Sequence, residues 1–196
     1  MALLLAPELR RDTLLLWLIG LCSALTIYAV FSWLPAFLSA ANVPLAAASL
    51  ALAAFSFGGI AGALIGGWLM DRMGSRLPMT GYVAAGALLA AFLAVTGWPG
   101  ASDGGLLYVG AFALGFAFCG LQPMFTALTS GIYQPAMRAS GIGAASAIGR
   151  FGALGSALLG ASAFQIGLPE FLLILSLVFV VALVALLFLR RHFPAR

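Results

Sequence analysis

Charged residues are scarce in this chain, and lysine is absent. Only 7% of the 196 residues are charged, while 64% are hydrophobic and the mean hydropathy is +1.16. Soluble domains carry roughly 25% charged residues, so this composition excludes an ordinary soluble domain. The net charge of +4 is carried by arginines at the ends of apolar runs. No basic patch with interleaved aromatic residues exists, so we expect no nucleic-acid partner.

Reactive side chains are also few. The two cysteines, Cys22 and Cys119, both fall inside apolar runs, where packing is a better explanation than a disulfide or a metal pair. His, Asp, Glu and Cys do not cluster, so the sequence predicts no metal site, no cofactor and no enzyme activity. The single histidine, His192, follows Arg191 near the C-terminus, and we expect it at a helix end rather than in a proton relay.

Long apolar runs fill the rest of the chain. Each approaches the roughly 20 residues that a helix needs to cross a bilayer, and only helices can satisfy their own backbone groups in lipid. We therefore predict an all-α membrane protein of three parts: a cytoplasmic juxtamembrane segment 1–12, a six-helix bundle 13–190 in which each helix packs antiparallel to the next, and a tail 191–196. The predicted spans are 13–37, 46–69, 78–98, 105–128, 139–163 and 169–189.

Orientation follows from the arginines that flank the spans. If the spans alternate in direction, all of these arginines fall on one side, and only Asp103 and Glu170 lie in the opposite loops. The positive-inside rule then predicts that both termini are cytoplasmic. The arginines concerned are Arg10, Arg11, Arg72, Arg76, Arg138, Arg190, Arg191 and Arg196.

Small residues recur every four positions in two of the predicted spans. Such faces allow helix backbones to approach closely in lipid, where no hydrophobic force drives association. Close helix packing is the simpler interpretation, and sliding of these helices during transport is compatible with it. The two series are Gly58, Gly62 and Gly66 in one span and Gly141, Ala145, Gly149 and Ala153 in the other.

The only strongly charged stretch in the middle of the chain runs from Gly67 to Arg76, as Gly-Trp-Leu-Met-Asp-Arg-Met-Gly-Ser-Arg. Its pattern, Gly-x-x-x-Asp-Arg-x-Gly-x-Arg, resembles the loop signature of the major facilitator superfamily. A second stretch, from Tyr133 to Gly152, resembles the eleventh helix of the superfamily's aromatic acid/proton symporter branch, although its proline is displaced by one to Pro135. Residues 11–17 and 32–35 are similar to the seventh helix of that branch.

This resemblance covers nearly the whole chain and implies helices seven to twelve, one half of a major facilitator fold, without helices one to six. It also implies a cytoplasmic gate, with Asp71 near the N-terminus of a neighbouring helix and Arg72 paired across helices. A solvated loop that only sets topology is the alternative. The expected gate residues are Gly67, Asp71, Arg72, Gly74 and Arg76.

Arg150 is the most informative single residue. It lies twelve positions after Arg138, which is about 18 Å into the bilayer at 1.5 Å per residue. A guanidinium at that depth costs roughly 2.5–3.5 kcal/mol or more and cannot lose its proton. Two interpretations remain open: a clamp for a substrate carboxylate, or a structural bond to helix carbonyls or to an acid on another half.

Three further residues are candidates for substrate contact. Gln122 precedes Pro123, which removes one backbone hydrogen bond of its helix. Tyr28 and Trp33 in the first span could stack on an aromatic acid, although tryptophan is also common at membrane interfaces. Packing is the alternative for all three.

Together these observations predict the C-terminal half of a secondary transporter in the bacterial inner membrane. The expected substrate is a small organic anion, an aromatic or other carboxylic acid, carried with protons by alternating access. No acidic residue lies inside a span, so we expect the proton site on a partner N-terminal six-helix half. An inactive truncated fragment and a six-helix permease or channel subunit are the alternatives.

Overall fold

A computed structural model describes residue 6, residues 9–98 and residues 104–192 of the chain. Over these residues it forms six helices, each long and apolar enough to cross a membrane, which confirms the predicted number of spans. The predicted turn at 99–103, including Asp103, and the C-terminal Arg196 lie outside the described residues. The helices are α1 (Arg10–Ala40), α2 (Leu45–Met73), α3 (Arg76–Thr96), α4 (Gly104–Ile132), α5 (Arg138–Phe164) and α6 (Leu168–Phe188).

Several helices are longer than the apolar runs that predicted them. α1 begins at Arg10 rather than Thr13, and α2 continues to Met73 rather than Leu69. The 31 residues of α1 measure about 46 Å, against a hydrocarbon core of about 30 Å. The apolar run marks only the lipid-facing part of a helix, and the polar ends continue beyond it.

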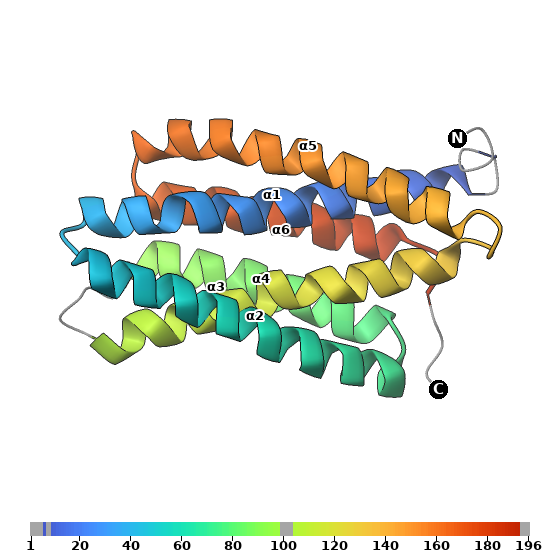
Figure 1. Cartoon of the computed structure of the whole chain (residues 1–196), viewed down its shortest axis with the longest axis horizontal. Coiled ribbons are helices and arrows are strands. Elements are labelled where there is room, and N and C mark those ends of the chain that lie inside the picture. Colours follow the sequence, from blue (N-terminus) through green and yellow to red (C-terminus); the bar gives the residue numbers. More distant parts are fainter. Residues whose placement is uncertain (1–5, 7–8, 99–103, 193–196) are drawn as a thin grey trace.

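The tightest helix pairs are not neighbours in sequence. Consecutive helices run in opposite directions, but α2 packs most extensively on α4 and α1 on α5, and the members of these two pairs run parallel (Figure 1). The prediction that each helix packs antiparallel to the next is confirmed, although these contacts are less extensive than those of the two parallel pairs. Most connections are short enough to fix direction, but they do not choose the packing partner, which depends on which faces carry small residues.

The α2–α4 pair shows how small residues set this choice. A Cβ atom at Gly58 or Gly62 would collide with the backbone of Phe112 or Phe116, and one at Gly115 would collide with the backbone of Phe55. The two backbones are thus in direct contact, as small residues at four-residue spacing permit. We call this contact, made by Gly58 and Gly62 of α2 and Gly115 of α4, the α2–α4 seam.

One end of the bundle collects the arginines. The start of α1, the end of α6, the α2–α3 turn and the α4–α5 connection lie at this end (Figure 1). It therefore holds Arg10, Arg11, Arg72, Arg76, Arg138, Arg190 and Arg191, and we call it the arginine-rich end. The predicted clustering of these residues at one end is confirmed, while the side of the membrane on which they lie stays a prediction.

Candidate functional site

Arg150 occupies the middle of α5, and its helix is held against α1 by the residues beside it. A Cβ at Gly149 would lie 3.6 Å from the Ala24 Cβ, and a Cβ at Gly152 would collide with the backbone of Leu21. Arg150 points away from this contact and is exposed. No hydrogen bond or ion pair joins its guanidinium to any residue that the structure describes. Among the described residues, a structural bond from Arg150 to helix carbonyls therefore finds no support.

Gln122 lies on α4 at the same depth, on the other side of the same turn of α1. Its Oε1 accepts a hydrogen bond of 2.9 Å from the Ser23 hydroxyl, and Ser23 precedes Ala24, which faces Gly149. Ser23 is fully buried, whereas Gln122 is exposed. The partner of the amide is therefore a serine hydroxyl rather than the carbonyl freed by Pro123, and α4 remains helical through that proline.

Of the two aromatic candidates, only Tyr28 reaches an open surface. Its side chain is 53% exposed, and it lies about one turn of α1 beyond Ala24. Trp33 instead packs on Phe164, with 5.8 Å between ring centroids, and fills the space left by Gly160. Gly160 is ten residues from Arg150 along α5. The structure therefore places Trp33 about 15 Å from Arg150 along α5, at 1.5 Å of rise per residue.

The expected gate stretch is mostly helix. Asp71 and Arg72 form the last turn of α2, and only Gly74 and Ser75 separate this helix from Arg76, the first residue of α3. Gly74 adopts φ 77°, a conformation that favours glycine. The Arg72 guanidinium lies 4.3 Å from the ring centroid of Trp68 in its own helix. The described residues give it no partner across helices, so the cross-helix pair stays a prediction, and Gly67 has no neighbour for a Cβ within 4 Å.

A separate cavity of about 470 Å³ lies between α2, α3 and α4, towards the arginine-rich end. Its walls are almost entirely apolar, and Tyr82 in its lining donates a hydrogen bond of 2.8 Å to the carbonyl oxygen of Gly62. None of the four predicted substrate contacts lines it. Among the described residues, no group of three or more His, Cys, Asp or Glu side chains could hold a metal ion.

The profile of the Major Facilitator Superfamily matches residues 8–196. The chain belongs to the major facilitator superfamily.

Curated relatives in this superfamily are transporters of aromatic acids. The gallate transporter of Pseudomonas putida is 32% identical over 84% of this chain and 36% of its own length. The 4-hydroxybenzoate transporter PcaK of Acinetobacter baylyi is 31% identical over 81% of this chain and 34% of its own length. The 3-(3-hydroxy-phenyl)propionate transporter of Escherichia coli is 34% identical over 84% of this chain and 40% of its own length. The chain thus spans little more than a third of each, and the resemblance to the aromatic acid branch is confirmed.

Solved structures support the same fold. The POT family transporter PepTSo superposes with a TM-score of 0.80 over 95% of this chain and 39% of its own, at 18% identity. A peptide transporter POT in complex with alafosfalin gives a TM-score of 0.65 over 89% of this chain and 37% of its own, at 20% identity. These identities establish the fold alone. The six helices form one half of a major facilitator fold, as predicted.

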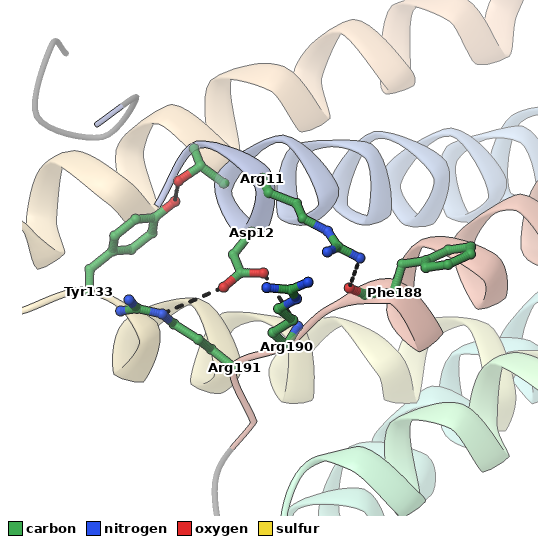
Figure 2. Close-up of polar contacts among 7 residues, drawn as sticks. Arg11, Asp12, Tyr133, Phe188, Arg190 and Arg191 are labelled. Carbon is green, nitrogen blue, oxygen red and sulfur yellow. Dashed lines mark hydrogen bonds and ion pairs between the residues drawn. The ribbon is translucent and has the colours of Figure 1, made fainter. Parts of the chain in front are cut away.

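This major facilitator half also contains a polar network that the sequence did not predict. Asp12, in the first turn of α1, is only 4% exposed. Its Oδ1 accepts a hydrogen bond of 3.3 Å from the Arg190 backbone N–H, and its Oδ2 lies 3.5 Å from Arg191 Nε. Figure 2 shows this carboxylate joining the start of α1 to the segment that follows α6, with Arg11 donating to the Phe188 carbonyl oxygen beside it.

Two further contacts extend the network across the arginine-rich end. The Tyr133 hydroxyl donates to Thr13 Oγ1 at 3.2 Å, and Ser75 Oγ lies 3.2 Å from His192 Nδ1. Burial and the neighbouring Arg76 lower the pKa of His192, against the opposing effects of the Leu189 and Leu186 carbonyls and of Asp12. His192 lies at a helix end as expected. The pairing of an Arg-Arg-Asp start with an Arg-Arg-His end is the sequence signal for this network, but the signal is meaningful only once α1 and α6 are known to meet.

Proposed function

We propose that this chain forms the C-terminal wall of a carrier for small aromatic carboxylates. The carrier moves its substrate together with protons by alternating access between two six-helix halves, as transporters with this repeat architecture do. The arginine-rich end faces the cytoplasm of a bacterial cell, in line with the positive-inside rule. Arg150 binds the substrate carboxylate, and Gln122 and Tyr28 line the same path.

The unpartnered Arg150 is the observation that carries this proposal. A guanidinium at the middle of the bilayer is costly unless water or an anion meets it, and the described part of this chain supplies neither an acid nor a carbonyl to Arg150. Arginine presents a planar fork of donors that matches both oxygens of a carboxylate. The aromatic acids carried by the relatives have this group.

Proton coupling is proposed from the position of the acidic residues. Asp12, Asp71 and Glu170 all lie in the first or last turn of a helix. A proton carried across the membrane needs a titratable group in the path. We therefore assign the proton site to the N-terminal half of the carrier rather than to this chain.

The first test measures uptake of labelled 4-hydroxybenzoate into proteoliposomes. These contain the full 196-residue chain paired with the N-terminal six-helix half of the gallate transporter. We expect Arg150→Ala to lower uptake roughly 30-fold or more, as loss of one member of a close charge pair costs about 2–5 kcal/mol. Arg150→Lys keeps the positive charge without the planar guanidinium and should restore only a small part of the wild-type uptake. Arg10→Ala is the matched control, because it removes an exposed arginine at the start of α1.

Normal uptake by Arg150→Ala, at equal amounts of inserted protein, would show that the carboxylate binds elsewhere.

Proton coupling has its own test in the same vesicles, because a protonophore removes the proton gradient without changing the binding site. We expect accumulation of the acid to stop when the protonophore is added. Accumulation that continues unchanged would contradict symport.

A further inference from the structure

The Ser23–Gln122 contact fixes which end of an amide faces the open surface between α1 and α4. A glutamine side chain has one acceptor end, Oε1, and one donor end, the Nε2 amide group. Here the Ser23 hydroxyl donates to Oε1 at 2.9 Å. Because Ser23 is fully buried and Gln122 is exposed, the oxygen faces inward and the amide group faces outward.

The outward amide group is available to a ligand. No hydrogen-bond partner for Gln122 Nε2 exists among the residues that the structure describes, and the Gln122 side chain is exposed. The Gln122 backbone carbonyl is already engaged at 3.1 Å by the Thr126 hydroxyl. What Gln122 presents at the depth of Arg150 is therefore a pair of N–H donors.

We infer that Gln122 is a specificity-determining residue that selects aromatic acids carrying a ring oxygen, and that Ser23 is the positioning residue that holds its amide in the donating orientation. This inference rests on the proposed function. Arg150 takes the carboxylate, and Gln122, on the opposite flank of the Ser23–Ala24 turn, donates to a ring hydroxyl oxygen. A site built to hydrogen-bond a substrate group discriminates against the analogue that lacks it, because its own polar atoms are then left unpaired.

The geometry also distinguishes Ser23 from an ordinary helix serine. Serine hydroxyls in helices usually bond the carbonyl three or four residues before them, as the nearby Thr26 hydroxyl does with Cys22. The Ser23 hydroxyl instead donates its hydrogen bond to Gln122 of another helix. Without that bond Oε1 has no fixed donor, and the amide can rotate to present either end.

The experiment compares 4-hydroxybenzoate with benzoate in the same proteoliposomes of paired halves. Each unlabelled acid competes with uptake of labelled 4-hydroxybenzoate, and the measured quantity is the ratio of the two inhibition constants. This ratio is independent of the fraction of folded carrier. We expect Gln122→Leu and Ser23→Ala to lower the preference for 4-hydroxybenzoate about tenfold, the value of one good hydrogen bond, while benzoate binding is kept. Ser23→Thr retains a donor and should retain the preference. Thr126→Ala removes a hydroxyl beside Gln122 without touching its amide and is the matched control.

Each outcome decides a separate point. An unchanged ratio in Gln122→Leu, or a wild-type carrier with no preference, would overturn the specificity role. If Gln122→Leu loses the preference for 4-hydroxybenzoate but Ser23→Ala keeps it, the positioning role of Ser23 is overturned. If neither acid competes, or if Arg150→Ala leaves both constants unchanged, the proposed function itself fails, and that result is distinguishable because it concerns both acids equally.

Discussion

The α2–α4 seam and the open face of α5 are built from the same kind of residue and differ in what meets them. In the seam, Gly58, Gly62 and Gly115 lie directly against backbone atoms of the opposite helix. On α5, Gly152 lies against the α1 backbone in the same way, but Gly143, Ser146 and Arg150 lie on the other side and are exposed. Small residues in the seam serve contact within the chain, while those around Arg150 leave space.

Adding one methyl group to each region should give the largest difference in stability. Gly115→Ala places a Cβ against the backbone of Phe55, which cannot move aside as a side chain would. We expect a loss of about 1–3 kcal/mol or more in unfolding free energy, seen as a lower thermal unfolding temperature in detergent. Gly143→Ala meets nothing within 4 Å and should be neutral or slightly stabilising, because alanine is the better helix former. Equal losses for both variants would remove the distinction between the regions.

Filling the open face should impair transport without impairing folding. Ser146 is exposed one turn from Arg150, so Ser146→Leu puts a bulky group into the space beside the guanidinium. We expect 4-hydroxybenzoate uptake to fall roughly five- to hundredfold, in line with about 1–3 kcal/mol of overpacking, with no change in unfolding temperature. Ser162→Leu is the control, since Ser162 is also exposed on α5 but lies about three turns from Arg150 and bonds only within its own helix. Wild-type uptake by Ser146→Leu would mean that lipid, rather than substrate, occupies this space.

The arginine-rich end differs from the surroundings of Arg150 in charge as well as in packing. Arg191 pairs with Asp12 at this end, whereas Arg150 has no ion pair among the described residues. Asp12→Asn keeps the shape of the side chain but removes the negative charge that accepts from the Arg190 backbone N–H and pairs with the Arg191 guanidinium. We expect a loss of about 1–3 kcal/mol, the cost of weakening a buried, charged hydrogen-bond acceptor, measured by thermal unfolding.

Glu170→Gln provides the control for this prediction. It removes an acid from the first turn of α6, where the helix dipole also favours negative charge, and the described residues offer its carboxylate no hydrogen bond or ion pair. A loss as large as that of Asp12→Asn would attribute the effect to the dipole rather than to the network.

The sequence predicted features that depend on one helix at a time and missed those that depend on pairs. Hydropathy identified six spans, and alternation of direction brought the described arginines to one end. Depth along α5 identified Arg150, because position in a helix follows from counting residues. The contact of Trp33 with Phe164 and the burial of Asp12 were not predicted, since the meeting of α1 with α5 and with α6 is a property of packing. The partner of Gln122, Ser23, is 99 residues away, and no local pattern connects them.

The smallest expected effect is a pH dependence at the arginine-rich end. His192 has a folded-state pKa below its ordinary value of 6.5, chiefly because of burial and then because of the positive charge of Arg76. The unfolded chain therefore binds the proton more tightly than the folded chain. The stabilisation that His192 provides is present above pH 6.5 and is lost as the pH falls from there through the folded-state pKa. The thermal unfolding temperature should drop between pH 8 and pH 5, and His192→Gln should reduce that drop.

The carboxylate of Asp12 on α1 opposes the lowering of the His192 pKa. Asp12→Asn should therefore lower the pKa of His192 further, which NMR titration of the imidazole ring measures. A pKa that stays constant or rises in Asp12→Asn would separate His192 from the Asp12 network and leave its contact with Ser75 as an isolated hydrogen bond.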